Sequence, residues 1–479
     1  MKSPKLRFVL LLAVSLLLLA ACGNAGGEEQ PPKPQEGVLT YAALNPLTRE
    51  QKRNIEAFNK EHPDAQIEVL DYSDEGGIDR LMTQLAIGWV PDIMELHRLR
   101  VNEERPTYGP YRPYGAEKIG GRTSSEGEYW MPYRQMARKG YLEDLWPYIE
   151  NDPDLGRDAV LEAPLKAAEV DGGLYILFRE VYIDTLAGAE SLVGDRDSWT
   201  TAELMEIFSS MADGSTILRY NITRWEVYSK LFASDMDRYI DWKAGQCSFD
   251  NDEFRSMVEF LSAFPAEFKT ALTRDELWKE ITLRRLEGEQ MLETVLITEA
   301  VDMARMDAVF GGNHVAFVGY PTADGTPCNF FNIYGITLAM ASTCQNKEAA
   351  WEFIGELIRP AYTLGKMKQM WWDYDITIPI NRKSYENATA ACIGINRRPT
   401  SSLYSYRGGP DLEVKGSTAE DGRRYEELVE RTTRFRWPDD TLSDIVWEAL
   451  GAYFAGDRTL DDTIRLIDNR VGLYLKEQQ

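Results

Sequence analysis

The sequence predicts an α/β protein with more than one domain, and three observations support this prediction. The chain has 479 residues, a length that suits two or three domains. Hydrophobic residues make up 44% of the chain and charged residues 27%, which is the balance of a globular protein. Strand-like and helix-like patterns alternate over residues 38–96, and this order favours a parallel sheet with right-handed crossovers.

The alternation consists of three short strands separated by two helices. Polar and apolar residues alternate from Gln66 to Leu70, as in a strand with one buried face. Thr48 and Gln51 have the spacing of a capping box, which marks the start of a helix, and Ile55 and Phe58 give that helix a buried stripe. The expected strands are 38–41, 66–70 and 91–96, and the expected helices are 48–62 and 77–88.

An insertion from residue 98 to residue 132 interrupts this order. It is rich in Arg, Pro, Gly and Tyr and has no clear period, so we expect a long loop. Its arginines suit an acidic sugar, although a solvated loop that balances an acidic surface explains them more simply. The elements expected further along are strands at 174–186, 315–319 and 335–341 and helices within 200–260 and at 347–358, 440–455 and 459–476.

The N-terminus indicates export and attachment to a membrane. Basic residues precede an apolar run from Phe8 to Ala21, which is too short to span a bilayer comfortably and predicts a signal peptide of residues 1–21. Small residues before Cys22 resemble a bacterial lipobox, which implies that Cys22 is acylated and carries palmitate or a similar chain. Residues 22–37 suit a flexible tether. We therefore expect a lipoprotein on the extracellular face of the bacterial cytoplasmic membrane.

Charge and composition exclude several classes of partner. The 53 Lys and Arg residues against 77 Asp and Glu give a net charge of −24, which disfavours nucleic acids and anionic lipid surfaces. Three His and five scattered Cys leave little material for a metal site, and we expect no metal and no cofactor. Beyond Cys22, the cysteines suit either two disulfides or buried thiols, and their spacing does not decide between these; they are Cys247, Cys328, Cys344 and Cys392.

Several segments resemble one family when they are taken together and in order. The chain resembles the extracellular solute-binding lipoproteins of ABC importers, in the class that includes maltose-binding protein. The segments that carry the resemblance are Asn54–Pro63, Leu85–Leu96, Val170–Tyr175, Asn346–Phe353 and Ala455–Asp462. They cover nearly all of the expected mature chain, and the insertion from about 98 to 132 is the main departure.

The resemblance implies a two-lobed fold in which each lobe is a mostly parallel sheet flanked by helices. It also implies three hinge crossings, near residues 180, 330 and 390–405. A first lobe would comprise 38–180 and 330–390, and a second lobe would comprise 181–329 and 400–479. We expect a monomer that captures a small solute, an oligosaccharide, in the cleft between the lobes. It would deliver this ligand unaltered to the subunits of an ABC permease.

The chemistry of sugars suggests which residues would line the cleft. Sugars present hydroxyls at their ring edges and C–H groups on their faces, so a site needs aromatic rings together with carboxylates, amides or Arg. Ligands of such sheets bind beyond the carboxyl ends of the strands. The ligand-binding candidates are Tyr41, Asn45, Glu95, His97, Arg179, Tyr182, Arg224, Trp225, Glu299, Phe331, Asn332, Tyr334 and Trp437.

Structural roles compete with these assignments. Tyr41 suits a core as well as a cleft, His97 suits a surface or cap, and Arg179 suits an ion pair at a hinge. About half of the candidates are expected to line the cleft. A secreted, lipid-anchored glycoside-acting enzyme is the alternative function, since the acids are numerous but no pair stands out. A purely structural surface lipoprotein is a third possibility.

Overall fold

The computed structural model describes most of the chain after the expected tether. The described residues are 37–74, 76–98, 129–242, 244–360, 377–393, 403–405, 411–414, 417–437 and 441–478. The predicted signal peptide, Cys22, almost all of the tether and most of the insertion lie outside these ranges. Within them, no helix has both the length and the apolar character needed to cross a membrane.

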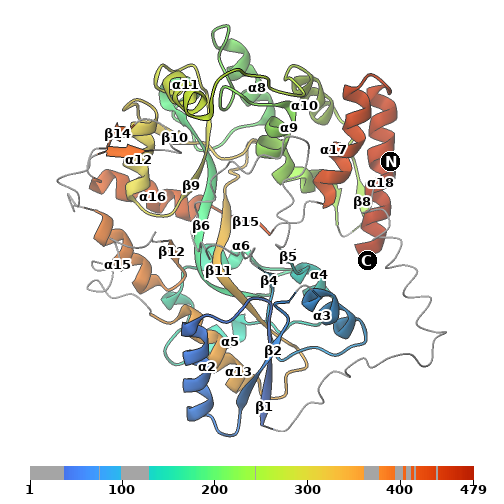
Figure 1. The fold of residues 1–479 in the computed structure, drawn as a ribbon, viewed down its shortest axis with the longest axis vertical. Coiled ribbons are helices and arrows are strands. Elements are labelled where there is room, and N and C mark those ends of the chain that lie inside the picture. The colour runs from blue at the N-terminus through green and yellow to red at the C-terminus, as the bar shows by residue number, and fades with distance from the viewer. Residues whose placement is uncertain are drawn as a thin grey trace.

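Nine of the described strands form one sheet that runs through the molecule (Figure 1). They are β1 (Val38–Ala43), β2 (Gln66–Asp71), β3 (Ile93–Glu95), β6 (Leu177–Ala189), β9 (Glu293–Ile297), β10 (Val315–Phe317), β11 (Phe330–Met340), β12 (Ile378–Pro379) and β15 (Arg434–Phe435). The order is β10-β6-β11-β3-β1-β2, with β9 and β12 also paired to β6 and β15 paired to β11.

Three small ladders lie apart from this sheet. Each consists of two short antiparallel strands. They pair β4 (His97–Arg98) with β5 (Tyr129–Trp130), β7 (Ile240–Asp241) with β8 (Gln246–Cys247), and β13 (Leu403–Ser405) with β14 (Asp411–Glu413).

The α/β fold class is confirmed, but the sheet is mixed rather than mostly parallel. Strand β1 pairs in parallel with β2 and β3, as the strand–helix–strand pattern predicted. Strand β6 pairs antiparallel with β9, β10, β11 and β12, and β11 pairs antiparallel with β3. The alternation of strands and helices that predicts parallel pairing ends at β3. Antiparallel strands can pair without a helix between them, so the later strands do not continue this alternation.

The first helix forms as its sequence predicts. Thr48 caps α2 (Arg49–Glu61) by accepting from the Gln51 backbone, and the Gln51 side chain accepts from the Thr48 backbone in return. Ile55 and Phe58 are buried against the sheet core, which confirms the predicted stripe. A second helix, α3 (Gly77–Ala86), completes the alternation.

Two long strands, β6 and β11, form the spine of the sheet. Strand β6 lies beside β11 along most of its length, and its C-terminal half also pairs with β9 and β10. The last residues of β11 pair with β3, so the spine connects β1, β2 and β3 at one end of the sheet with β9 and β10 at the other (Figure 1). The register shifts between Tyr334 and Thr337, and Gly335 between them has φ +90°, a value that favours glycine.

Near the start of β11, two hydrophobic cores lie on opposite faces of the spine. Phe331 belongs to one core and Phe330 to the other, because successive residues of a strand point to opposite faces. We call them the first core, which contains Leu39 and Ile93, and the second core, which contains Val446 and Ile467. The lobe boundaries expected from the sequence stay predictions.

Helices cover both cores. Those of the second core include the paired helices α17 (Thr441–Phe454) and α18 (Leu460–Gln478), which lie side by side in Figure 1. The remaining described α-helices are α4 (Tyr133–Arg138), α5 (Trp146–Asn151), α6 (Glu162–Ala167), α7 (Glu190–Val193), α8 (Thr201–Ser210), α9 (Arg224–Val227), α10 (Asp252–Ser262), α11 (Arg274–Leu286), α12 (Val301–Val309), α13 (Lys347–Gly355), α15 (Arg382–Cys392) and α16 (Ala419–Arg431). Three described segments are 3-10 helices, η1 (Arg157–Ala159), η3 (Ala233–Tyr239) and η4 (Glu356–Ile358), and one is a π-helix, η2 (Tyr228–Phe232).

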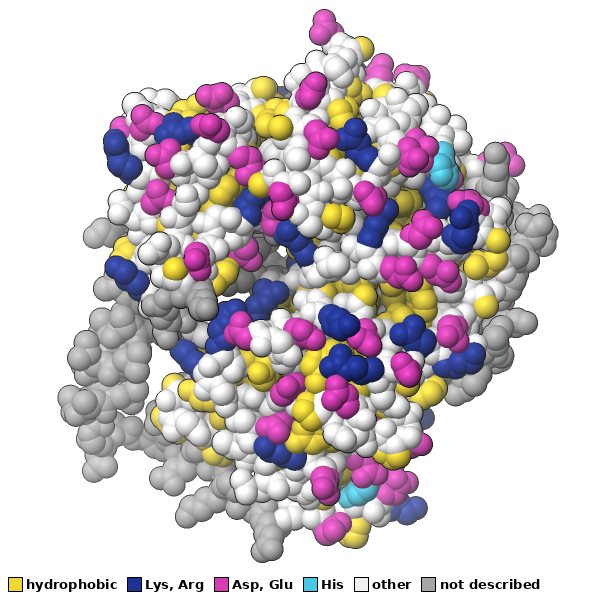
Figure 2. All heavy atoms as spheres, turned by 180° about the vertical axis from the view of Figure 1, so that it is seen from behind, with side chains coloured by type: hydrophobic (Ala, Val, Ile, Leu, Met, Phe, Trp, Pro, Cys, Tyr) yellow, Lys and Arg dark blue, Asp and Glu magenta, His cyan; other side chains and the backbone are white. Residues whose placement is uncertain are grey.

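The visible surface is charged, and the described cysteines are unpaired. Figure 2 shows acidic and basic side chains interspersed over one face of the molecule. The four cysteines whose pairing was left open are free thiols, and all except Cys247 are buried.

We expect Gly319→Ala to lower the free energy of unfolding by about 2–3 kcal/mol, because Gly319 has φ +68° and an added Cβ would lie 2.9 Å from the Cys328 carbonyl oxygen. Gly325→Ala is the matched control, since Gly325 has φ +76° but its Cβ would meet only a Thr200 methyl group at 3.5 Å. The control should lose about 1 kcal/mol. Urea unfolding measures both, and equal losses would contradict the close approach at Gly319.

Candidate functional site

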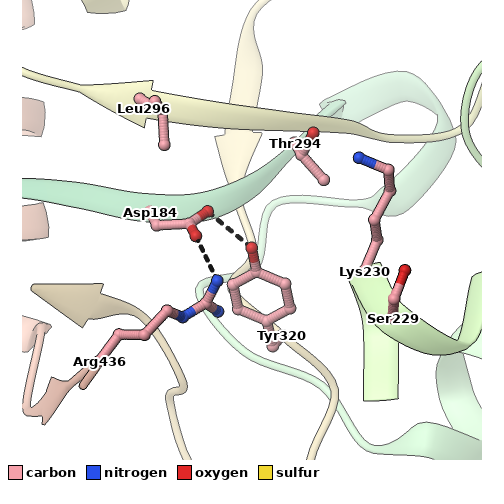
Figure 3. A pocket seen from close by; sticks show the side chains of 7 residues that line it. All are labelled: Asp184, Ser229, Lys230, Thr294, Leu296, Tyr320 and Arg436. Atoms are coloured by element: carbon pink, nitrogen blue, oxygen red, sulfur yellow. Dashed lines mark hydrogen bonds and ion pairs between the residues drawn. The ribbon is translucent and has the colours of Figure 1, made fainter. Parts of the chain in front are cut away.

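A pocket lies against the sheet spine, on the face that carries the second core. Its cavity volume is about 60 Å³, well below the roughly 300–1,000 Å³ of most small-molecule sites, so the pocket can hold only part of a larger ligand. The pocket is open to solvent on one side. Its lining residues are Asp184, Ser229, Lys230, Thr294, Leu296, Tyr320 and Arg436, which Figure 3 shows.

Strand register brings three of these side chains to the same face. Asp184 on β6 lies directly opposite Leu296 on the antiparallel strand β9. Thr294 is two residues before Leu296 and therefore points to the same side of the sheet. Leu296 is 37% exposed, which makes an apolar side chain available at the pocket surface.

Asp184 is held by two partners from different parts of the chain. The Tyr320 hydroxyl donates to Asp184 Oδ1 at 2.6 Å, and Arg436 Nη1 donates to Asp184 Oδ2 at 2.7 Å (Figure 3). The Arg436 guanidinium also lies over the Phe330 ring, 4.5 Å from its centroid. Burial alone would lower the pKa of Arg436, but Asp184 and Tyr320 raise it above its ordinary value, so the guanidinium stays charged.

Two further pocket residues, Ser229 and Lys230, lie in the π-helix η2. This turn follows α9, whose first turn is fixed by a capping box between Thr223 and Glu226. The Tyr228 hydroxyl donates to the Ser443 carbonyl at 2.9 Å and so attaches η2 to α17. Such π-helical turns occur often at functional sites. In Figure 3, Lys230 and Arg436 come from opposite sides of the pocket.

A four-residue segment, Arg434 to Trp437, connects the pocket to both cores. Arg434 pairs with Asp235 of η3 on the side of the second core, and Arg436 pairs with Asp184 on that same side. Phe435 and Trp437 belong to the first core. We call this segment the clasp, because its alternate side chains hold both faces of the sheet.

Four predicted residues form one buried network at the end of β1 and β3. Glu95 accepts from the Tyr41 hydroxyl at 2.6 Å and from the Leu44 and Asn45 backbone N–H groups at 2.8 and 3.0 Å. The Asn45 side chain bridges Glu95 and the His97 carbonyl, at 2.8 Å each. Glu95 is fully buried and positions the loop between β1 and α2.

Ionisation in this network is shifted by burial. Burial raises the pKa of Glu95, and hydrogen bonds from Tyr41, Asn45 and Leu44 oppose that rise. Burial and the Glu95 carboxylate raise the pKa of Tyr41, so its hydroxyl keeps the proton that it donates.

An aromatic cluster links this network to the clasp. The His97 ring stacks on Trp130 with 3.6 Å between their centroids, and Trp130 meets Trp437 edge-on at 4.7 Å. Tyr133 contacts Trp437 at the same distance, and Trp437 Nε1 donates to the Met131 carbonyl at 2.8 Å. Trp437 is therefore brought together with His97, but as a buried member of the first core.

Five predicted residues lie on the spine. Asn332 is directly opposite Tyr182, and Phe331 is fully buried in the first core. Tyr334 is half-buried beside the register shift. Arg179 Nη1 lies 3.9 Å from Glu50 Oε1, which connects the spine to α2. The spine gathers these side chains near the pocket strands, but none is among the seven that line it.

The last three predicted residues have structural partners elsewhere. Arg224 donates to the Leu261 and Phe264 carbonyls at 2.9 Å each, and Trp225 packs against Trp447. Glu299 forms an ion pair with Arg305 at 2.8 Å. None of the thirteen predicted residues lines this pocket, and their assignment to a ligand-binding cleft stays a prediction.

The pocket lies on a face of the sheet, whereas the predicted residues were chosen beyond the ends of strands. Asp184 and Thr294 lie within strands, two and five residues from the predicted Tyr182 and Glu299. The sequence signal for the pocket was Asp184, an acidic residue within a mostly apolar strand. A buried acidic group needs polar or charged partners, so its position points to a polar site. The alternation of Arg and aromatic residues in the clasp is the matching signal for Arg436.

In the part of the chain that the structure describes, no group of three His, Cys, Asp or Glu side chains could hold a metal ion. The pocket lining combines two hydroxyls, two cations, one engaged carboxylate, an aromatic ring and an apolar side chain.

Comparison with solved structures identifies the fold. No family model and no curated protein matches the sequence. A periplasmic oligogalacturonide-binding protein from Yersinia enterocolitica aligns over 92% of this chain and 99% of its own, with a TM-score of 0.53 and 14% identity. The chain has the fold of a periplasmic solute-binding protein. The fold that the sequence motifs implied is thereby confirmed.

Two designed enzymes share the solute-binding fold. One is a de novo designed cysteine esterase called ECH19, with a TM-score of 0.52 and 13% identity, and the other is a designed esterase improved by directed evolution, with 0.51 and 14%. Each aligns over 93% of this chain and 100% of its own. Function must therefore be argued from the site and not from the fold.

We expect Glu95→Gln to change how stability depends on pH. The raised pKa means that the native state holds the Glu95 proton more tightly than the unfolded state, so this contribution is complete below about pH 4.5 and is lost as pH rises through the raised value. The variant lacks this titration. The stability of the natural protein relative to Glu95→Gln should therefore fall between pH 4.5 and 7, as measured by urea unfolding. Glu56→Gln, on the exposed face of α2, should show no such trend, and parallel behaviour of the two variants would contradict the assignment.

Proposed function

We propose that this protein is the substrate-binding component of an ABC importer and that it captures an oligosaccharide against the spine, with part of one sugar in the pocket. The observation that carries the proposal is the composition of the pocket. Hydroxyls of Ser229 and Thr294 and the charged groups of Lys230 and Arg436 suit the edge of a sugar ring, and Leu296 suits its C–H face. The fold shared with an oligogalacturonide-binding protein supports this proposal.

Binding without reaction fits the state of the pocket carboxylate. Both oxygens of Asp184 accept hydrogen bonds, one from Tyr320 and one from charged Arg436. Glycoside hydrolysis uses two carboxyl groups, of which one donates a proton to the leaving oxygen. A carboxyl group that is engaged on both oxygens suits the orientation of Arg436 instead. We therefore propose a binding protein rather than the alternative glycoside-acting enzyme.

The spine supports a hinge between two lobes. Strands β6 and β11 extend to both ends of the sheet, and the register shift at Gly335 interrupts their ladder. We propose that the ends of the sheet move about this point and close over the ligand, and that the permease subunits recognise the closed form.

We also propose a lipid anchor. The expected signal peptide ends at Ala21, so acylated Cys22 would hold a monomeric protein on the extracellular face of the membrane through the tether. Expressed in a Gram-positive host, the natural protein should fractionate with membranes, and Cys22→Ser should appear in the medium. Membrane attachment of the variant would contradict the anchor.

Binding and reaction can be separated in one experiment. A thermal-shift screen with neutral and acidic oligosaccharides should give at least one ligand that raises the melting temperature. Chromatography after incubation should recover that sugar unchanged. A cleaved product would favour the enzyme, and the absence of any shift would overturn the proposed function.

For a sugar found in that screen, we expect Leu296→Ser to lower affinity roughly tenfold, because it removes the apolar side chain that would face the sugar ring. Leu473→Ser is the matched control, since Leu473 is 62% exposed on α18 and is not among the pocket residues. Calorimetric titration measures both affinities. Equal affinity of Leu296→Ser and the natural protein would place the sugar elsewhere.

A further inference from the structure

The described pocket is too small for the whole of the ligand that we propose. Its cavity volume of about 60 Å³ equals the share of about two water molecules in the liquid, which leaves room for one substituent of a sugar ring. An oligosaccharide has several rings. The rest of such a ligand must lie outside the pocket, on a surface that continues from its lining.

Aromatic side chains continue from one edge of the pocket. Trp225 on α9 lies four residues before the pocket residue Ser229, a spacing close to one helical turn, and therefore lies on the same side of this helical segment. The centroid of its ring lies 4.9 Å from that of Trp447 on α17. The Trp447 ring in turn stacks on Tyr228, with 5.0 Å between centroids and 26° between planes. We call Trp225 and Trp447 the tryptophan pair.

The tryptophan pair is partly open to solvent. Tyr228 is fully buried, whereas Trp225 and Trp447 are only partly buried. Because Tyr228 stacks on one face of the Trp447 ring, the exposed part of that side chain belongs to its other face and its edge. An aromatic face that is open to solvent is a surface on which the C–H groups of a sugar ring can pack.

The indole N–H groups of the tryptophan pair are also distinctive. Within the described ranges, neither Trp225 nor Trp447 donates its N–H to an acceptor in the protein, and both take part in ring contacts only. A tryptophan N–H in this state is available to an oxygen of a ligand. By contrast, each of four buried tryptophans donates Nε1 to an acceptor: Trp146 to Glu169, Trp199 to the Gly319 carbonyl, Trp351 to Asp152 and Trp437 to the Met131 carbonyl.

We infer that the tryptophan pair forms a second sugar subsite, which binds the unit next to the one that enters the pocket. This inference rests on the proposed function and extends its site along α9 and α17. The ring faces pack against C–H groups of the second sugar, and the two N–H groups donate to its oxygens. Neither contact requires a charge on the ligand, so this subsite selects for chain length.

The test compares ligands of increasing length. The probes are glucose, xylose and galacturonate with their linear oligomers of two, three and four units. Isothermal titration with the natural protein measures each affinity, and competition against the longest member measures the weak ones. In at least one series, the step from one unit to two should raise affinity roughly tenfold, because the second unit adds an aromatic contact and hydrogen bonds.

Variants of Trp447 locate this step. Trp447→Ala should remove most of the tenfold gain from the second unit, while affinity for the single sugar changes less than about twofold. Trp447→Phe keeps an aromatic face but lacks the N–H donor, so it should lose roughly threefold of the gain, and it decides the test if Trp447→Ala does not fold. Trp242→Ala is the matched control, since Trp242 is 37% exposed and packs on Tyr474 outside the pocket lining. It should leave both affinities unchanged, and melting temperatures confirm that each variant folds.

The outcomes separate the subsite from the proposed function. If affinity does not rise with the second unit, or if a folded Trp447 variant keeps the whole gain, the inference fails and the binding function stands. An equal loss for the single sugar and the longer chains also contradicts a separate subsite. If no sugar binds at all, both fail. A length gain that the Trp447 variants reduce and Trp242→Ala keeps supports the inference.

Discussion

The ion pair between Asp184 and Arg436 is the contact on which the pocket depends. Asp184 is 9% exposed, and isolating such a carboxylate from water is unfavourable unless it is paired and hydrogen-bonded. Arg436 and Tyr320 satisfy one oxygen each, and the Phe330 ring supports the guanidinium. Removing Arg436 would leave the buried Asp184 carboxyl without its ion-pair partner, which is more destabilising than losing a surface pair. Three distant segments of the chain are thereby fixed around one cavity.

The clasp extends this constraint to both cores. Its strand geometry sends Arg434 and Arg436 to one face and Phe435 and Trp437 to the other. Arg436 therefore cannot shift without disturbing the packing of Trp437 against Trp130 and Tyr133. If the ends of the sheet move as we propose, the clasp is the element through which the motion changes the pocket. The register shift at Gly335 lies on the adjacent strand, where a change of backbone angle meets little steric resistance.

Local signals in the sequence predicted local structure well. The Thr48 capping box, the buried stripe of α2 and the last two helices follow from short-range rules, and the structure contains them. The pocket depends instead on which strands are neighbours. That Asp184 faces Leu296 is a matter of register between segments more than 100 residues apart, and no local pattern specifies it. Trp437, which was predicted to bind the ligand, follows Arg436 in the sequence and packs in the first core, while Arg436 lines the pocket on the other face.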